Sequence, residues 1–442
     1  MKSADRLLRK DIVGWSLYDF ANTIYSMNIT SMYLKRYIVD DLGKDDRYFD
    51  IPFSLSMLLA ALLLPALGAM SDHSAKKKIF LFLFTLTCCI AVGGMTFVPP
   101  GFIFVTIILF IAANFSYEAG MPFYNSLLYS VASGRRARLV SGIGVGVGYV
   151  GAILGIILVQ PFVSGSVLGL DVPFIEGGGK VASFLPTALL FALFALPIFL
   201  WVKEAPVKST APKVSWKKAY KDVWDGLRQT KKYPGVLRFL VADYFFEDAV
   251  ATVIVNISLY LSVVVGLAED QISTFLIITP IAAVIGSFFI GKLAQIWSLK
   301  RLVNIIVYGW VIALILFVFV ENMMFIWILG SIVGVLMGGL WTTTRPLLAE
   351  LVPREELGRF FGLFSLSGRA AAFMAPLIWT TVVYFFQPDR ILGQTTISIF
   401  GINDMDAAKL PYRVGVLSLS LMMIVGLYIF RRVPSGADRV NG

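Results

Sequence analysis

Histidine and cysteine are almost absent from this chain of 442 residues. His73 is the only histidine, and the two cysteines, Cys88 and Cys89, are adjacent in an apolar stretch. Metal chemistry that needs paired histidines is therefore excluded, and adjacent cysteines do not build a disulfide framework. The sequence also lacks HExxH and GxSxG, so an intramembrane enzyme is the least favoured class, and we expect no metal and no cofactor.

Charged residues are also scarce, at 15% of the chain, whereas 57% of residues are hydrophobic and the mean hydropathy is +0.79. A soluble protein carries about a quarter charged residues, so the composition indicates a membrane protein. The formal charge of +10 does not indicate nucleic-acid binding, because the cations fall mostly in short loops on one side of the membrane.

Apolar runs of about 20 residues, long enough to cross a bilayer, recur along the whole chain. An unpaired backbone cannot face lipid, so each run is predicted to be a helix. We predict an all-α membrane protein with twelve transmembrane helices in two six-helix bundles. The predicted segments are 12–38, 51–71, 79–98, 101–131, 140–163, 181–202, 235–265, 272–297, 301–320, 323–350, 358–386 and 410–431.

Lysine and arginine are concentrated in every second loop, and this alternation continues through all twelve predicted crossings. Since cytoplasmic loops carry the excess of basic residues, both termini are predicted to be cytoplasmic. We expect a monomer in the bacterial inner membrane. The longest polar stretch, 203–234, divides an N-terminal bundle, 1–202, from a C-terminal bundle, 235–442. Its sequence KKAYKDVWDGLRQTKKY predicts an amphipathic helix on the membrane surface, with binding of an acidic partner as the alternative.

A glycine, an aspartate and a run of lysines follow the second segment, at Gly68, Asp72, Lys76 and Lys77. This spacing resembles the loop motif of the major facilitator superfamily, in which such residues would form a cytoplasmic gate. Lysine-rich turns also occur in the cytoplasmic loops of membrane proteins in general, because these loops carry an excess of lysine and arginine. The corresponding turn of the second half has Gln295 in place of Asp72.

Polar side chains recur inside the first and fourth segments. Tyr18, Asp19 and Asn22 lie in the first, and Glu118 and Asn125 lie in the fourth. Such groups are costly at membrane depth, so they normally face a cavity or a partner. We expect Tyr18, Asp19, Asn22 and Asn125 to bind substrate and Glu118 to titrate. The alternative for the fourth segment is hydrogen bonding between helices.

Two acids and two arginines stand in the second half. Asp243 and Glu247 are spaced i, i+4, so the carboxylates are neighbours and invite a shared proton. Arg345 and Arg369 are cations at membrane depth and are predicted to bind an anionic solute. The alternative is that these acids and arginines only form structural ion pairs, or that the arginines extend to the membrane surface.

Two glycine-rich runs match nucleotide-binding motifs by chance. The run 146–151 fits GxGxxG, and 286–293 nearly spells a Walker A loop, but both lie inside bilayer-length segments. We predict that the glycines of the first run pack helices together. The second run has Leu293 in place of the hydroxyl that binds Mg²⁺, so it implies no ATPase.

The runs GWSLYDFANTIYSMNI and RPLLAELVPREELGRFFGLFSLSGRAAA resemble the autophagy-related vacuolar effluxer family of the major facilitator superfamily, including its bacterial relatives. The family's helix 1 core is matched by Tyr18, Asp19, Ala21 and Asn22, and Arg369 stands where members commonly carry lysine. The resemblance implies twelve helices, alternating access and, for vacuolar members, efflux of amino acids.

These observations favour a secondary transporter of a small polar solute, amino-acid-like or anionic, coupled to protons and working by alternating access. A carrier of amphiphiles such as lysolipids is the alternative, and it would need a lateral opening to lipid. The expected partners are therefore the solute, protons and the lipid bilayer, without nucleic acid.

Overall fold

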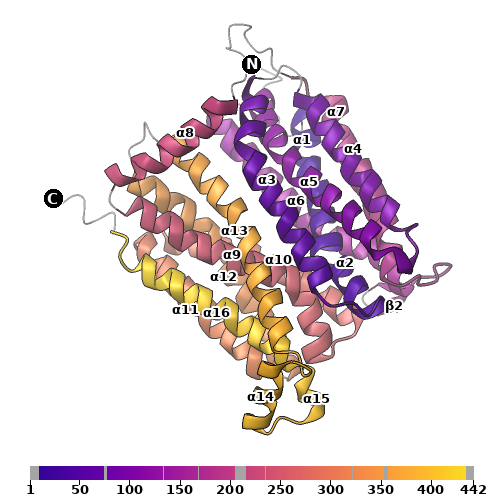
Figure 1. Ribbon diagram of the computed structural model, residues 1–442. Helices are drawn as coiled ribbons and strands as arrows, with labels where there is room; N and C mark the ends of the chain where they lie inside the picture. The colour runs from indigo at the N-terminus through magenta and orange to yellow at the C-terminus, as the bar shows by residue number, and fades with distance from the viewer. Residues whose placement is uncertain are drawn as a thin grey trace. The chain divides into compact units, whose positions relative to one another are not determined.

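The computed structural model describes residues 9–434, except 74–76, 133, 168, 205–215, 234, 321 and 353–356, and most of them are helical (Figure 1). The chain divides into two compact units, Met1–Lys221 and Asp222–Gly442. Their boundary falls inside helix α8 (Trp216–Gln229).

The N-terminal unit is built from six long helical stretches. The first is one continuous run with π-helical turns, and a short antiparallel hairpin precedes the last. The elements are α1 (Lys10–Tyr25), η1 (Ser26–Tyr33), α2 (Leu34–Arg36), η2 (Tyr37–Asp41), α3 (Arg47–His73), α4 (Lys77–Met95), η3 (Pro100–Phe102), α5 (Ile103–Val131), α6 (Gly134–Ser164), β1 (Ser166–Val167), β2 (Leu170–Asp171), η4 (Lys180–Ser183) and α7 (Phe184–Trp201).

The C-terminal unit also contains six long helices, with two short ones before the last. Its elements after α8 are η5 (Thr230–Lys232), α9 (Val236–Tyr260), η6 (Leu261–Val265), α10 (Glu269–Leu293), α11 (Leu299–Phe319), α12 (Met323–Leu351), α13 (Leu357–Phe385), α14 (Ile391–Phe400), α15 (Asp404–Ala407) and α16 (Leu410–Phe430).

Eleven helices within the described ranges are long and apolar enough to cross a membrane. The twelfth predicted segment, 12–38, corresponds to the helical run Lys10–Asp41, which carries several charged side chains. The all-α membrane fold predicted from the sequence is therefore confirmed.

The six long helices of each unit pack in the same scheme. The first helix contacts the fifth and sixth, the second contacts the fourth, and the third contacts the fourth and sixth. In the N-terminal unit these contacts are α1 with α6 and α7, α3 with α5, and α4 with α5 and α7; in the C-terminal unit they are α9 with α13 and α16, α10 with α12, and α11 with α12 and α16. The weak repetition in the sequence is thus matched by a repeated packing arrangement.

Glycines let neighbouring backbones meet at two of these contacts. A Cβ on Gly151 of α6 would lie 2.5 Å from the Phe20 carbonyl oxygen of α1, and a Cβ on Gly338 of α12 would lie 2.1 Å from the Ala283 carbonyl oxygen of α10. A Cβ on Gly286 of α10 would likewise meet the Val335 backbone at 2.5 Å. Gly151 therefore packs helices together, as predicted for the run 146–151, and Gly286 of the second run does the same.

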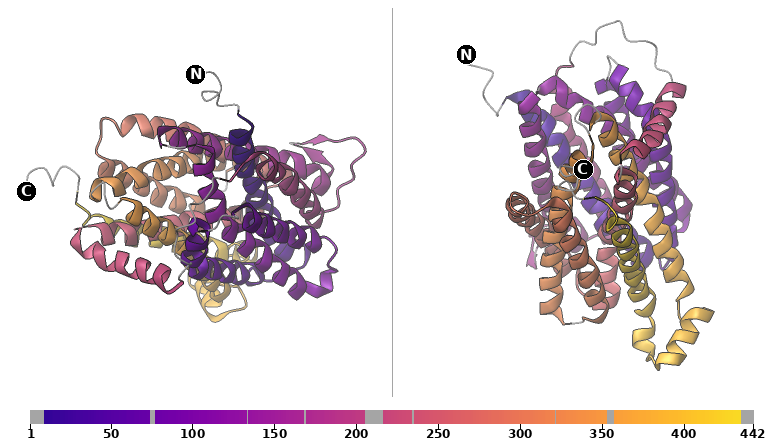
Figure 2. Two further views of the ribbon diagram at one scale, coloured as in Figure 1. Left: turned by 90° about the horizontal axis from the view of Figure 1, so that it is seen from above. Right: turned by 90° about the vertical axis from the view of Figure 1, so that its left-hand side faces the viewer.

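The stretch between α13 and α16, predicted as a loop, contains helices α14 and α15. In Figures 1 and 2 these two helices extend beyond the ends of α13 and α16. The ten residues of α14 are too few to span a bilayer. Apolar runs of bilayer length therefore do not reveal this helix in the sequence. The predicted amphipathic segment is helix α8, on which Tyr220, Trp224 and Leu227 are exposed. Its position on a membrane surface stays a prediction.

We expect Gly338→Ala to destabilise the protein by about 1–3 kcal/mol, because the added methyl group would overlap a backbone carbonyl that cannot move aside. The control is Gly146→Ala, since nothing lies within 4 Å of its Cβ position. Alanine favours a helix over glycine by about 1 kcal/mol, so this control should be neutral or stabilising. Thermal unfolding in detergent measures both, and equal midpoints for the two variants would contradict the packing role.

Candidate functional site

Two acids of α9 and two residues of α12 meet in the C-terminal unit. Asp243 and Glu247 are four residues apart, as are Trp341 and Arg345, so each pair shares one face of its helix. The Trp341 indole Nε1 donates a hydrogen bond to Glu247 Oε2 at 3.0 Å. Arg345 lies close enough to interact electrostatically with both carboxylates. We call these four residues the acid–arginine cluster.

Among the side chains that the structure describes, the charges of this cluster do not balance, since two carboxylates face one guanidinium. Asp243 is fully buried, and neither of its carboxylate oxygens accepts a hydrogen bond from any residue in the described ranges. Arg345, in contrast, is exposed on the surface of its unit. A buried carboxylate without compensation costs several kcal/mol, so this arrangement favours binding of a proton or exchange of ion partners.

A third acid of α9 holds a different helix. The Asp248 side chain is fully buried, and its Oδ1 accepts a hydrogen bond from the Ala375 backbone N–H at 2.9 Å. Ala375 precedes Pro376 inside α13, the helix that also carries Arg369. Asp248 therefore ties α9 to the proline position of α13.

The ends of α10, α11 and α12 enclose an open cleft of about 640 Å³ in the same unit. Gln295, Ser298, Thr342 and Glu350 are among the residues that line it, and Arg345 is not. Gln295 stands where the second copy of the loop motif departs from the first. The cleft is therefore separate from the acid–arginine cluster.

In the N-terminal unit, Asp19 interacts with a tyrosine that belongs to a stack of aromatic rings. Trp15 and Tyr18 of α1 stack on Tyr124 of α5, with ring centroids 4.8 and 4.9 Å apart, and the Asp19 carboxylate interacts with the Tyr124 hydroxyl. A Cβ on Gly144 of α6 would lie 2.7 Å from Asp19 Oδ2. Glycine at this position therefore makes room for the acid between α1 and α6.

Other polar groups of α1 bind across helices. The Tyr25 hydroxyl donates to Asn114 Oδ1 at 3.3 Å, and Asn114 Nδ2 donates to the Ser56 hydroxyl at 2.7 Å, which joins α1, α5 and α3. Asn22 Nδ2 donates to the Met121 sulfur at 3.4 Å. The Tyr18 hydroxyl and the Thr85 hydroxyl lie 2.7 Å apart. The interhelical hydrogen bonding considered as an alternative for the fourth segment is thus present at Asn114.

The structure brings some of the predicted residues together. Asp243, Glu247 and Arg345 form one cluster. Tyr18, Asp19 and Asn22 all belong to α1, where Tyr18 and Asn22 are buried and Asp19 is half-buried. Glu118 is half-buried on α5 and contacts neighbouring groups, and Asn125 on the same helix is exposed.

Several predicted residues lie outside the described part of the structure. Lys76 is one of them, and the surroundings of Gly68 and the side chains of Asp72 and Arg369 are others. Lys77, the last residue of the predicted gate, begins α4 and is half-buried.

Sequence reasoning missed Trp341, Tyr124 and a buried charged group at Lys35, Asp46 and Asp50. Trp341 and Tyr124 give no signal in the sequence, because aromatic residues are common in membrane helices. Lys35 does give one, since it lies inside a predicted membrane segment that is followed by an acidic loop.

Comparison with known sequences identifies relatives along the whole chain. The sequence model of the family described as "Vacuole effluxer Atg22 like" matches residues 47–384. An uncharacterized MFS-type transporter of Bacillus subtilis, YxiO, is 24% identical over 433 residues, which cover 95% of this chain and 94% of that protein. Autophagy-related protein 22 of Coccidioides immitis is 23% identical over 410 residues and covers 74% of this chain and 66% of its own length.

Solved structures share the fold at low sequence identity. A bacterial homolog of the human lysosomal transporter Spinster, inward-facing and unoccupied, aligns with a TM-score of 0.69 at 12% identity over 96% of both chains. The nucleoside transporter NupG aligns with a TM-score of 0.68 at 15% identity over 94% of this chain and 98% of its own.

We expect Asp248→Ala to destabilise the protein by about 1–3 kcal/mol, because it removes the acceptor of a buried backbone N–H. Asp248→Asn keeps an oxygen at this position and should cost less. Asp389→Ala is the control, since 72% of the Asp389 side chain is exposed. The midpoints of thermal unfolding in detergent rank the stabilities of the three variants. A loss of stability in Asp389→Ala as large as that in Asp248→Ala would refute the structural role of Asp248.

Proposed function

Because this chain belongs to the Atg22-like vacuole effluxer family and is a membrane transporter of the major facilitator type, we propose that it carries a small polar solute by proton-coupled alternating access. The observation that carries the proposal is the acid–arginine cluster, in which Asp243 and Glu247 face the guanidinium of Arg345. The solute is amino-acid-like or anionic.

Arg345 supplies the binding group for a solute carboxylate. Its guanidinium is exposed, always charged and able to hold a carboxylate through two parallel hydrogen bonds. Arg369, on α13, is proposed as a second cation of the same site. Two cations on different helices can bind one anionic group together, and movement of either helix would then change the affinity for that group.

The proton enters through competition for Arg345. When a solute anion binds the guanidinium, the buried Asp243 and its neighbour Glu247 lose part of their counter-charge. A proton held between the two carboxylates then restores the balance. Solute and proton therefore favour each other's binding, which is the thermodynamic basis of coupled transport.

The N-terminal unit is proposed to supply Tyr18, Asp19, Asn22 and Asn125 to the solute and Glu118 as a further titrating acid. Asp19 is a carboxylate beside stacked aromatic rings, a setting suited to a solute amino group.

The remaining parts of the proposal concern orientation and control. We propose that both termini are cytoplasmic, that the protein is a monomer in a bacterial inner membrane, and that Gly68, Asp72, Lys76 and Lys77 form the cytoplasmic gate. The loop lysines and the amphipathic helix α8 would then lie against the inner leaflet.

Glu247→Gln tests the coupling. The amide oxygen can still accept from Trp341 while the charge is lost, so solute exchange should persist in proteoliposomes and proton-driven accumulation should fall about tenfold or more. Asp404→Asn, an exposed position, is the control and should keep both activities. Proton-driven accumulation of solute by Glu247→Gln at the native level would refute the proposal that this acid couples transport to protons.

Arg369→Met and Arg345→Met test the binding of the anionic group. A thermal-shift panel of amino acids, peptides, sugars and lysolipids first identifies a ligand of the purified protein. Each variant should then weaken binding of an anionic or zwitterionic ligand by about tenfold or more, since a charge-assisted hydrogen bond contributes roughly 1.5–3 kcal/mol. Intact uptake by Arg369→Met would refute its role, and binding confined to lysolipids would favour an amphiphile carrier.

A further inference from the structure

Trp341 makes the two acids of the acid–arginine cluster unequal. Its indole Nε1 donates to Glu247 Oε2 at 3.0 Å, where α12 contacts α9. Neither carboxylate oxygen of Asp243 accepts a hydrogen bond from any residue in the described ranges, although this side chain is fully buried. One acid of the pair is therefore held by a donor and the other is not.

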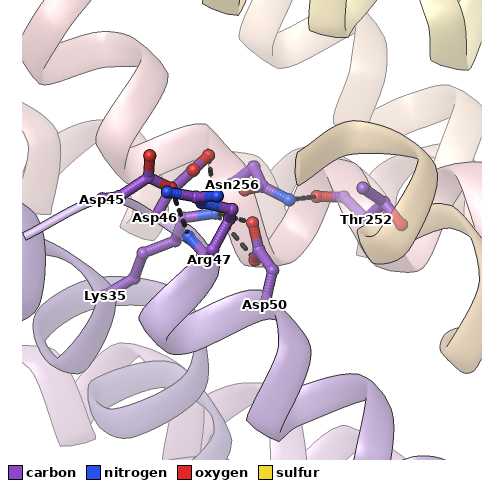
Figure 3. A network of polar contacts seen from close by, with 7 residues as sticks. All are labelled: Lys35, Asp45, Asp46, Arg47, Asp50, Thr252 and Asn256. Atoms are coloured by element: carbon purple, nitrogen blue, oxygen red, sulfur yellow. Dashed lines mark hydrogen bonds and ion pairs between the residues drawn. The ribbon is translucent and has the colours of Figure 1, made fainter. Parts of the chain in front are cut away.

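Buried carboxylates elsewhere in the structure do accept hydrogen bonds. In the N-terminal unit Asp50 accepts two from Lys35 Nζ, both at 2.7 Å (Figure 3), and in the C-terminal unit Asp248 accepts one from the Ala375 backbone N–H at 2.9 Å. Such donors stabilise the ionised form, because a charged oxygen accepts a stronger hydrogen bond than a neutral one. Since no described donor reaches Asp243, its surroundings favour the neutral acid.

The charges around the pair do not by themselves separate the two acids. Of the described side chains, Glu247 of the same helix and Arg345 of α12 are the charged groups that act on Asp243. Helices α13 and α16 also pack against α9, and their described side chains add no charge near Asp243. Arg345 acts on Glu247 as well. What distinguishes Glu247 is the hydrogen bond from Trp341 and its shallower burial.

We propose that Trp341 is a positioning residue that decides which acid of the pair binds the coupling proton. While its indole N–H holds Glu247 as a carboxylate, the proton resides on Asp243. Because this assignment rests on the proposed function, in which the pair binds one proton, it deepens that function: it names the acid that carries the proton and the residue that directs the proton there.

The hydrogen bond between Trp341 and Glu247 then has a role in the transport cycle. Trp341 and Arg345 lie one turn apart on the same face of α12, so a shift of α12 against α9 changes the contacts of both. Once the indole N–H leaves Glu247, this carboxylate competes for the proton. An O–H bond of Asp243 breaks as an O–H bond of Glu247 forms, and the negative charge passes the other way. The proton thereby moves to the less buried acid, from which release is easier.

Infrared spectroscopy of the full chain, with and without carbon-13 in the glutamate carboxyl carbon, tests where the proton lies. The label lowers the frequency of a protonated glutamic acid and leaves an aspartic acid unchanged. The difference between the spectra of the native chain and Asp243→Asn should contain a protonated-carboxyl band that the label does not move. A difference without such a band, or with a band that moves with the label, would overturn the assignment to Asp243.

Trp341→Phe tests the directing role, because it removes the indole N–H and keeps an aromatic ring. Loss of a hydrogen bond to a charged group changes an equilibrium constant by roughly tenfold to a hundredfold. The ratio of proton on Asp243 to proton on Glu247 should therefore fall by about tenfold or more, and a band that moves with the label should appear.

Trp310→Phe is the matched control for this substitution. Trp310 is fully buried in α11 of the same unit, and its Nε1 has no hydrogen-bond partner among the described residues, so the change removes no hydrogen bond. Its spectrum should match that of the native chain. A Trp341→Phe spectrum identical with that of Trp310→Phe would refute the role of Trp341.

Failure of this assignment is distinguishable from failure of proton coupling. If Glu247→Gln loses proton-driven accumulation and the Trp341→Phe spectrum matches its control, coupling stands and the role of Trp341 falls. If Glu247→Gln accumulates solute at the native level while Trp341→Phe still redistributes the proton, coupling through Glu247 is refuted and the position of the proton stands.

Discussion

The cost of enclosing a carboxylate among helices constrains both units of this protein. In the C-terminal unit Asp243 and Glu247 face Arg345, and in the N-terminal unit Asp46 and Asp50 face Lys35. Among the described side chains, the C-terminal cluster has one acid more than it has bases. Such an arrangement is a poor source of stability, because apolar residues of the same volume pack at lower cost. It is suited to taking up a proton or a solute, since binding relieves the excess charge.

The packing of the helices makes these enclosed charges possible. Glycines at the crossings bring backbones close enough to shut out lipid, and at Gly144 the absence of a side chain leaves space for the Asp19 carboxylate. The same contacts recur in both units, with the first helix against the fifth and sixth. Asp19 stands in this contact between the first and fifth helices of its unit, and Asp243 is buried on α9, the first helix of the other unit.

Sequence reasoning reached the fold because the bilayer allows few solutions. A backbone that must pair its own polar groups forms helices of a fixed length, and hydropathy reveals them. It also found Asp243, Glu247 and Arg345, since ionised groups at membrane depth need an explanation. It missed the buried group of Lys35, Asp46 and Asp50 because the acidic loop before α3 reads as a solvated connection, and only tertiary packing buries Asp46 and Asp50. It missed α14 because ten residues cannot span a membrane.

The cations of the two clusters differ in their exposure. Lys35 is enclosed and holds both oxygens of Asp50, so a solute would have to break two short hydrogen bonds and enter a closed space to reach it. A proton needs no such space. Arg345 is exposed, and its guanidinium can turn from the carboxylates to an incoming anion. The accessibility of the cation therefore distinguishes the two sites, since an incoming anion can reach Arg345 but not Lys35.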